Sequence, residues 1–420
     1  MAMQRTRRRA PLWLMGLSNA TYGLVGGFIV LPLPQLLAHE GVPEWRIAAV
    51  SAACLFPGFW VFLLGPLLDV RFSRRWYATA FAALAGVGLT AALLERGRLP
   101  VLEGLLMMSY ACGVLSSNAL GGWLATIVRA EDEARLSAWT QVGTFVGNGT
   151  MVVLAGELLR GLPLGVAAPL LGAVVVVPVM VFPWMPVDVA DPAHDDEAVM
   201  NGAPGVELRM RERFGDLFRD VGRLLRRREV LLTLLLFVAP TGSFALTNLL
   251  GGEVREFHAT DAFVSRMGGA VLSVAGAASC LLLPVLARWV RALPLYLLIG
   301  TAGSVFTLLL LLLPRSPSMF AVAFLGENMV QALSFTAAVA ICFHTIGREN
   351  PLAATQFSLL TSATVLPIVY MGVLDGRVST LHGVSGMFVV DGALSLLACG
   401  VMAVVMRWGG GRDEGPGARF

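Results

Sequence analysis

The stretch MFAVAFLGENMVQALSFTAAVAICF, residues 319–343, decides how the rest of this chain is interpreted. It contains one charged side chain, Glu327, in a run that is otherwise apolar, small or neutral. About 20 such residues are enough for an α-helix to cross the roughly 30 Å hydrocarbon core of a bilayer. We therefore interpret the stretch as a membrane-spanning helix that carries a carboxyl group.

The composition of the whole chain supports the same interpretation. Of its 420 residues, 56% are hydrophobic and 14% are charged, whereas soluble domains hold roughly 25% charged residues. The net charge of +3 is too small to indicate a nucleic-acid partner. The five cysteines lie in separate apolar segments without a CxxC pair, so neither a disulfide framework nor a metal site is expected.

The same length requirement predicts an all-α integral membrane protein with twelve transmembrane helices. The apolar run after the basic N-terminal residues continues to about Leu33, too far for the core of a signal peptide, so the first helix is expected to be retained. The predicted spans are 11–34, 45–68, 76–94, 99–124, 136–159, 164–186, 229–250, 262–287, 293–313, 317–346, 352–374 and 382–407.

Charge and polarity predict the orientation and the domains. All 31 Lys-plus-Arg positions are Arg, and most fall in the segments on the side of the N-terminus. The positive-inside bias therefore predicts that both termini are cytoplasmic. The longest polar segment, 187–228, would separate an N-terminal six-helix bundle (1–186) from a C-terminal six-helix bundle (229–420).

This linker has two parts. The first is acidic and rich in chain breakers, which predicts a flexible segment. In the second, apolar residues recur at helical spacing among arginines, which predicts a basic amphipathic helix on the inner leaflet. That helix could sense lipid or a partner, or simply tether the halves, and we favour the tether. The apolar positions are Phe214, Leu217, Phe218, Val221, Leu224 and Leu225.

The two halves share one short stretch of similar sequence. GPLLDVRFSRR (65–75) follows the second span, and LPVLARWVRAL (283–293) follows the eighth, at the equivalent place. Parallel halves of this kind resemble the major facilitator superfamily (MFS), which implies a substrate site near the midplane. The resemblance also implies that spans 1, 4, 7 and 10 line the cavity, and it selects Asn19, Asn118, Asn248 and Glu327 there.

The loop after the second span is a candidate gate. It resembles the superfamily's loop between helices 2 and 3, with a glycine, an aspartate and paired basic residues in order. In this chain Asp69, Arg74 and Arg75 would latch the inner gate. The alternative is that the arginines only anchor the loop on the positive side of the membrane.

Glu327 is the principal functional candidate. Glu327, Gln331 and Ser334 share one helix face, and Asn328 lies beside it. An acidic residue within a span costs several kcal/mol, so the face is expected to meet a cavity or another helix. We favour a proton-carrying role for Glu327 over interhelical packing, because an amide would suffice for packing.

Other polar residues inside the spans complete the candidate set. Asp391 is a second carboxylate for proton coupling. Gly143 and Gly147 form a GxxxG pair, expected to allow close helix contact. The proposed substrate-binding residues are Asn19, Tyr22, Asn118, Gln141, Asn148, Asn248, Asn328, Gln331 and Gln356.

Two further segments narrow the resemblance. The chain resembles helices 10 and 11 of the AmpG-like permeases at three short segments, Glu327-Asn328, Thr336-Ala337-Ala338 and 354–357 (ATQF). It also resembles the exit of their helix 2 at 66–69 (PLLD), which is followed by SRRW. That group includes importers of cell-wall muropeptides with protons, acetyl-coenzyme A transporters and siderophore importers. The chain departs from the muropeptide permeases at 116–123, SSNALGGW, where they carry acidic residues.

Together these features predict a secondary active transporter and not an enzyme, because the histidines are scattered and no phosphate-binding loop is present. It would import a muropeptide-like solute with protons by alternating access, without a cofactor, as a monomer in the bacterial inner membrane. Its partners would be a polar small molecule, protons and lipids. The alternatives are a siderophore or acyl-coenzyme A transporter of the same family, and a non-transporting membrane sensor.

Overall fold

The computed structural model describes residues 10–70, 72–186, 219, 221–242, 246–260, 263 and 267–410. These residues contain helices and no strand. They fall into two compact units: unit 1 comprises residues 1–224 and 346–359, and unit 2 comprises 225–345 and 360–420. Segment 346–359 therefore groups with the N-terminal part of the chain. The three-part division at 187–228 stays a prediction.

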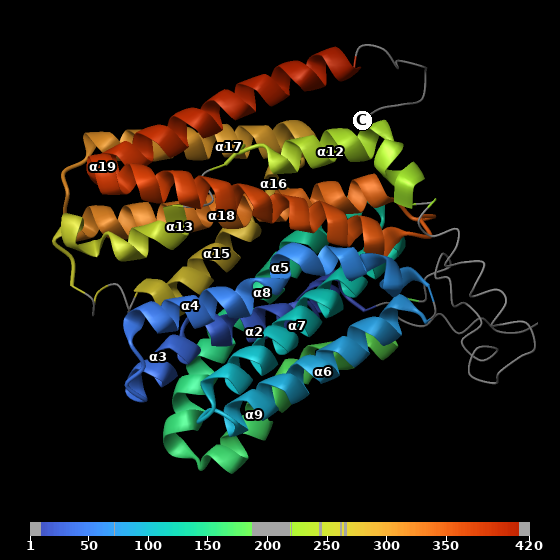
Figure 1. Ribbon diagram of the computed structural model, residues 1–420. Helices are drawn as coiled ribbons and strands as arrows, with labels where there is room; N and C mark the ends of the chain where they lie inside the picture. Colours follow the sequence, from blue (N-terminus) through green and yellow to red (C-terminus); the bar gives the residue numbers. More distant parts are fainter. Residues whose placement is uncertain are drawn as a thin grey trace, which may run out of the picture. The chain divides into compact units, whose positions relative to one another are not determined.

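Unit 1 is built mainly from the blue-to-green helices of Figure 1. Helices α6, α7 and α9 lie side by side, and α8 packs on α1 and α2. The elements are α1 (Leu12–Leu17), α2 (Ala20–Val30), α3 (Pro32–His39), α4 (Glu44–Leu55), α5 (Pro57–Trp60), the 3₁₀ helix η1 (Val61–Asp69), α6 (Arg74–Leu94), α7 (Leu99–Ile127), η2 (Ala130–Asp132), α8 (Glu133–Gly161), α9 (Leu164–Val176) and η3 (Val177–Trp184).

Unit 2 holds most of the remaining helices. Its core gathers aromatic side chains such as Phe257, Phe320 and Phe388. The elements are α12 (Arg228–Val238), α13 (Leu246–Leu249), η4 (Leu250–Gly252), η5 (Val254–Phe257), the π-helical turn η6 (Met267–Val271), α15 (Leu272–Cys280), α16 (Leu283–Leu286), α17 (Ala292–Leu309), η7 (Leu310–Leu312), α18 (Pro317–Ile346) and α19 (Ala353–Gly410). The ends of α18 and α19 that meet at 346–359 belong to unit 1.

Ten helical stretches of the described residues are long and apolar enough to cross a membrane, so the chain is a multi-pass membrane protein by its helices. The prediction of twelve separate spans is not confirmed. One difference is that predicted span 229–250 is not continuous: α12 ends at Val238, and Ala239 is extended (ψ 145°). Proline disfavours helical geometry in the residue before it, and Pro240 follows Ala239.

The second difference concerns the last two predicted spans, which form one element, α19, of 58 residues. Its backbone leaves helical geometry at Gly383, where φ is +63° and ψ is −167°. Figure 1 shows two arms of α19 running back from a bend near the α19 label. A positive φ is readily adopted only by glycine, so this residue permits the chain to reverse there.

The GxxxG prediction is confirmed in unit 1. A Cβ atom on Gly143 would lie 2.8 Å from the Gly16 carbonyl oxygen, and one on Gly147 would lie 2.4 Å from the Ala20 carbonyl oxygen. Because real side chains do not approach backbone so closely, only glycine allows α8 to contact α1 and α2 as it does.

Part of the predicted amphipathic helix, residues 214–218 and 220, lies outside the described residues; residues 221–226 are helical. The cytoplasmic location of the termini also stays a prediction.

Candidate functional site

Glu327 lies in α18 and is fully buried within unit 2. The hydroxyl group of Thr307, on the neighbouring helix α17, donates a hydrogen bond to Glu327 Oε1 at 2.7 Å. A buried carboxylate is tolerated where such donors replace water. The sequence did not single out Thr307, because a threonine in an apolar helix is common and carries no spacing signal.

The Thr307 hydroxyl has a second partner, the carbonyl oxygen of Gly303 in its own helix, at 3.1 Å. A hydroxyl carries one hydrogen and two lone pairs. When Glu327 is ionised, Thr307 can donate to it; when Glu327 is protonated, Thr307 can donate to Gly303 and accept from the acid. The arrangement therefore accommodates both protonation states of Glu327 without moving a backbone atom.

The other members of the Glu327 face have different surroundings. Gln331 is half-buried, and Ser334 is buried with its hydroxyl oxygen lacking a hydrogen-bond partner among the described residues. Asn328 donates to the carbonyl oxygen of Leu272 in α15 at 3.0 Å. In this conformation Asn328 therefore joins two helices, which is the packing role that amides commonly play in membrane bundles.

Asp391, the second predicted carboxylate, is buried in α19, and its neighbour is an acid that sequence analysis missed. Asp375, in the other arm of α19, is also fully buried and interacts with Asp391. Asp375 was missed because it lies one residue beyond the predicted end of span 352–374. A longer span would have included it.

The predicted gate residues form a connected cluster in unit 1. Arg74 Nε donates to Asp69 Oδ1 at 2.8 Å, and both side chains are fully buried. The same carboxylate accepts the backbone N–H groups of Ala354 (3.2 Å) and Thr355 (2.8 Å) and the Thr355 hydroxyl (2.8 Å). Asp69 therefore caps the N-terminus of α19, where exposed N–H groups and the helix dipole favour a negative charge.

Arg74 extends this cluster to the segment before α19. Its guanidinium donates to the backbone carbonyls of Asn350 (3.2 Å) and Pro351 (2.9 Å). The Asn350 side chain in turn donates to Gln356 Oε1 at 2.7 Å. Gln356, predicted to contact substrate, thus lies in the gate cluster. Arg75 is half-buried beside it and makes none of these contacts.

A second polar group of unit 1 lies between α2, α7 and α8. Asn19 donates to the Thr144 hydroxyl (3.0 Å) and accepts from the Ser117 hydroxyl (2.8 Å). The hydroxyl groups of Tyr22 and Tyr110 are 3.2 Å apart. The structure therefore assembles the predicted Asn19–Tyr22 pair with three hydroxyl-bearing residues that sequence analysis missed.

The remaining candidates are dispersed. Asn118 is buried and donates to the Ser358 hydroxyl at 2.8 Å. Gln141 and Asn148 are half-buried on α8, and Asn248 is exposed on α13. No group of three His, Cys, Asp or Glu side chains able to hold a metal occurs among the described residues. The structure thus brings the candidates together in several small groups within the units.

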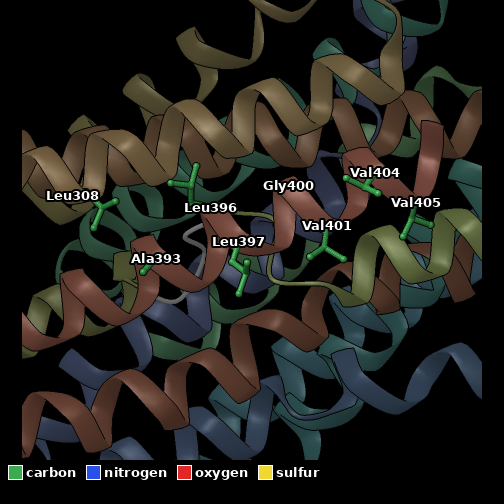
Figure 2. Close-up of a pocket in the computed structure, with 8 residues that line it drawn as sticks. All are labelled: Leu308, Ala393, Leu396, Leu397, Gly400, Val401, Val404 and Val405. Carbon is green, nitrogen blue, oxygen red and sulfur yellow. The ribbon is translucent and has the colours of Figure 1, made fainter. Parts of the chain in front are cut away.

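Unit 2 also has a hollow of about 760 Å³, which does not coincide with any of these groups. Figure 2 shows that its walls come from α17 and the second arm of α19. No polar or charged side chain lines it, so it offers nothing that could bind a polar solute. Its lining residues are Leu308, Ala393, Leu396, Leu397, Gly400, Val401, Val404 and Val405.

Apolar spans with buried acids inside them are typical of membrane transport proteins. The comparison with protein families narrows this class: the model described as "Major Facilitator Superfamily" matches residues 14–355. The chain belongs to the major facilitator superfamily. No curated protein sequence matches it significantly.

Solved structures share the fold at low sequence identity. The proton:xylose symporter XylE has 14% identity and a TM-score of 0.67, with 94% of this chain and 95% of that chain covered. The human organic anion transporter MFSD10 has 17% identity and a TM-score of 0.64, with 95% and 100% covered. The E. coli fucose:proton symporter FucP has 14% identity and a TM-score of 0.61, with 93% and 98% covered. At these identities the likeness establishes the fold and not the cargo.

Proposed function

We propose that this MFS protein is a secondary active transporter that imports a polar, muropeptide-like solute together with protons. Alternating access in the bacterial inner membrane would carry both across. The observation that carries the proposal is the fully buried Glu327 carboxyl with the Thr307 hydroxyl at 2.7 Å. Asp391 is a second candidate for proton coupling.

The proton-coupling role rests on the energetics of Glu327. An acid inside a span costs several kcal/mol, a cost that a purely structural side chain avoids when an amide will do. Thr307 can bond to Glu327 in either protonation state, as a site that loads and releases a proton requires. Two structures of similar fold are described as symporters of protons with a sugar, which supports the same coupling here.

The polar cargo is inferred from the amide and hydroxyl groups of unit 1. Asn19, Ser117 and Thr144 supply donors and acceptors, and Tyr22 with Tyr110 supplies phenol rings suited to sugar faces. The resemblance to AmpG-like permeases narrows this class to a sugar- and peptide-bearing solute. The further residues that we propose for binding are Asn118, Gln141, Asn148, Asn248, Asn328, Gln331 and Gln356.

Asp69 and Arg74, with Arg75 beside them, would act as a latch that holds the inner gate closed. Asp69 holds the N-terminus of α19, and Arg74 holds the carbonyl groups just before it. Loss of the Asp69–Arg74 ion pair would release all of these contacts at once. Transport by alternating access would require such a latch to open and close.

The test is uptake into proteoliposomes. Purified protein is reconstituted, an inward proton gradient is applied, and accumulation of a labelled anhydro-muropeptide is measured for the parent and for Glu327→Gln. We expect gradient-driven accumulation by the parent and a loss of at least tenfold in the variant. Glu157→Gln is the matched control, because Glu157 is an exposed carboxylate on α8 and its change should leave uptake intact.

Other outcomes separate the alternatives. Transport of siderophores or acyl-coenzyme A compounds with no muropeptide uptake would retain the carrier and reject the cargo. Gradient-driven uptake that Glu327→Gln leaves unchanged would reject the role of Glu327. Binding of a ligand by the reconstituted protein, with no movement of any compound tested, would favour a non-transporting sensor.

A further inference from the structure

The apolar hollow of unit 2 follows the second arm of α19, residues 384–410. Figure 2 shows its lining side chains along this arm from Ala393 to Val405, with Leu308 of α17 at the Ala393 end. At 1.5 Å per helical residue, the distance from Ala393 to Val405 is about 18 Å along the arm. The volume of about 760 Å³ lies within the roughly 300–1,000 Å³ of ordinary ligand pockets. The hollow is therefore long, narrow and large enough for a ligand.

Gly400 is one reason why the hollow exists. A Cβ atom added there would have no other atom within 4 Å, so the backbone of the arm is open at this point. Leu397 and Val401, on either side of it, are 64% and 52% exposed and stand out beyond the glycine. At Gly392, in contrast, an added Cβ would lie 2.8 Å from Leu308 Cγ. Helix α17 therefore closes one end of the hollow, whereas the middle stays open.

The open side of the hollow belongs to elements that are suited to a membrane. Both α17 and α19 lie in stretches long and apolar enough to cross a bilayer. An exposed apolar face on such a stretch meets lipid chains instead of water. The hydrocarbon core of a bilayer is about 30 Å thick, so one leaflet is about 15 Å deep. A hollow of about 18 Å therefore matches the length of one acyl chain in one leaflet.

A positive charge stands at the far end of the hollow. The membrane-spanning stretch of α19 ends at Arg407, two residues after the last lining residue, Val405. Gly400, Val404 and Arg407 are spaced i, i+4 and i+7, so Arg407 continues the face that lines the hollow. Arg407 is exposed, and a guanidinium stays charged and matches phosphate oxygens with paired N–H donors. A phosphate-binding group therefore lies where a lipid chain would join its headgroup.

We infer that this hollow binds one acyl chain of an anionic phospholipid, whose phosphate is bound by Arg407. Apolar fit alone gives little selectivity in a bilayer, because any lipid chain is as apolar as leucine. Selection therefore comes from the charge: a basic residue at the membrane surface attracts anionic lipids. A zwitterionic lipid such as phosphatidylcholine carries its own cation beside the phosphate, which weakens its attraction to Arg407.

A second copy of the chain fits this face less well. Two copies inserted in one membrane share the same orientation, so their two-fold axis runs along the membrane normal. Pairing through the hollow would therefore place Arg407 of each copy at the same depth on the shared face. Like charges at one level repel each other, whereas an anionic headgroup is attracted by Arg407. The charge at the end of the hollow thus favours a lipid over a partner copy.

The test is native mass spectrometry of the purified full chain, titrated with phosphatidylglycerol or phosphatidylcholine. In the parent we expect the tightest-bound phosphatidylglycerol to be held about fivefold more strongly than phosphatidylcholine. Arg407→Gln should remove this preference. Gly400→Leu should weaken binding of both lipids, because the new side chain fills the hollow. Arg377→Gln, which removes an exposed arginine from the first arm of α19, is the matched control and should leave the preference intact.

Two competitors separate the chain of the lipid from its headgroup. Lyso-phosphatidylglycerol, which has one acyl chain, should displace bound phosphatidylglycerol from the parent. Soluble glycerophosphoglycerol, which has none, should not displace it. Displacement by the soluble headgroup alone would mean that Arg407 binds an anion without any use of the hollow, and it would overturn the inference.

Three further results would reject the site. The preference for phosphatidylglycerol could persist in Arg407→Gln, or both lipids could bind folded Gly400→Leu as they bind the parent. Loss of a dimer in Gly400→Leu with unchanged lipid binding would identify the face as an interface between copies. Thermal unfolding in detergent checks each variant. If Gly400→Leu unfolds early, Ala393→Leu replaces it, because Ala393 is exposed and lines the other end of the hollow.

The inference is independent of the cargo and of proton coupling. Lipid titration requires neither a substrate nor a gradient. If the lipid binds as expected while no muropeptide is taken up, the site stands and the proposed function fails. If uptake is driven by the gradient while the hollow shows no lipid preference, this inference alone is rejected.

Discussion

At the residue scale, the Thr307 hydroxyl group bears directly on the proton exchange that we propose for Glu327. Thr307 can bond to the acid in both protonation states, and it does so across a helix boundary. Valine has nearly the shape of threonine but lacks the hydroxyl, so Thr307→Val isolates that contribution. The change should therefore alter the pH dependence of transport more than the stability of the protein.

We expect Thr307→Val to raise the internal pH needed for half-maximal uptake by about one unit. A hydrogen bond to a charged group contributes about 1.5–3 kcal/mol against about 0.5–1.5 kcal/mol for a neutral one, and about 1.4 kcal/mol corresponds to one pH unit. Because the lost bond stabilises the ionised form more than the protonated form, proton release becomes harder and requires a more alkaline interior. Uptake into liposomes of graded internal pH measures the shift.

Ser304→Ala is the control for that experiment. Ser304 lies one turn earlier on α17, is also buried, and donates to the carbonyl of Gly300 in its own helix. Its removal should leave the pH profile in place. An equal shift in both variants would mean that general loosening of α17, and not the bond to Glu327, controls uptake.

At the scale of elements, glycines decide which helices can touch. The α8 backbone approaches α1 and α2 so closely at Gly143 and Gly147 that a methyl group would collide with carbonyl oxygens. Sequence spacing identified this pair, although it could not name the partner helices. At Gly383 the positive φ instead permits the reversal between the arms of α19, which the two separate predicted spans had implied.

We expect Gly147→Ala to destabilise unit 1 by about 1–3 kcal/mol, the usual cost of overpacking a filled interface. The new methyl group would lie 2.4 Å from the Ala20 carbonyl oxygen. Thermal unfolding in detergent should show a lower midpoint. Gly104→Ala is the control, since no atom lies within 4 Å of the Cβ it would add to α7; an equal loss there would contradict the packing argument.

At the scale of the whole molecule, the Asp69 cluster determines to which unit a distant segment belongs. Segment 346–359 is separated from Asp69 by most of the chain, yet it groups with the N-terminal helices in unit 1. The ion pair with Arg74, the cap on α19 and the carbonyl contacts account for that grouping. Further contacts come from Arg348 to Val128 and from Asn118 to Ser358.

We expect Asp69→Ala to speed amide hydrogen exchange at Ala354 and Thr355 by at least about tenfold. Loss of an N-cap costs about 1 kcal/mol, and leaving a buried arginine without its partner costs about 3–5 kcal/mol. Mass spectrometry of peptides covering 350–358 measures the change. Asp132→Ala removes a half-buried carboxylate paired with Arg135 at 3.8 Å and should have no effect there; unchanged exchange in Asp69→Ala would reject the latch.

The sequence by itself determined the class of fold and several of the important residues. Long apolar runs can satisfy their backbone in a membrane only as helices, so composition and length were enough to predict a multi-pass helical protein. The cost of placing an acid in such a run singled out Glu327 and Asp391 in the same way. Asp69 and Arg74 were predicted from a local motif that lies in one loop.

Only the tertiary structure decided which side chains are partners. Three pairs of neighbours come from separate helical segments: Thr307 with Glu327, Asp375 with Asp391, and Thr355 with Asp69. Periodicity within one helix cannot specify the rotation of that helix against its neighbour. The helix break after Val238 depends on Pro240, which disfavours helical geometry in the residue before it. Hydropathy averaged over a whole span does not detect such a local effect. Length and polarity thus predict the spans, whereas packing decides the chemistry between them.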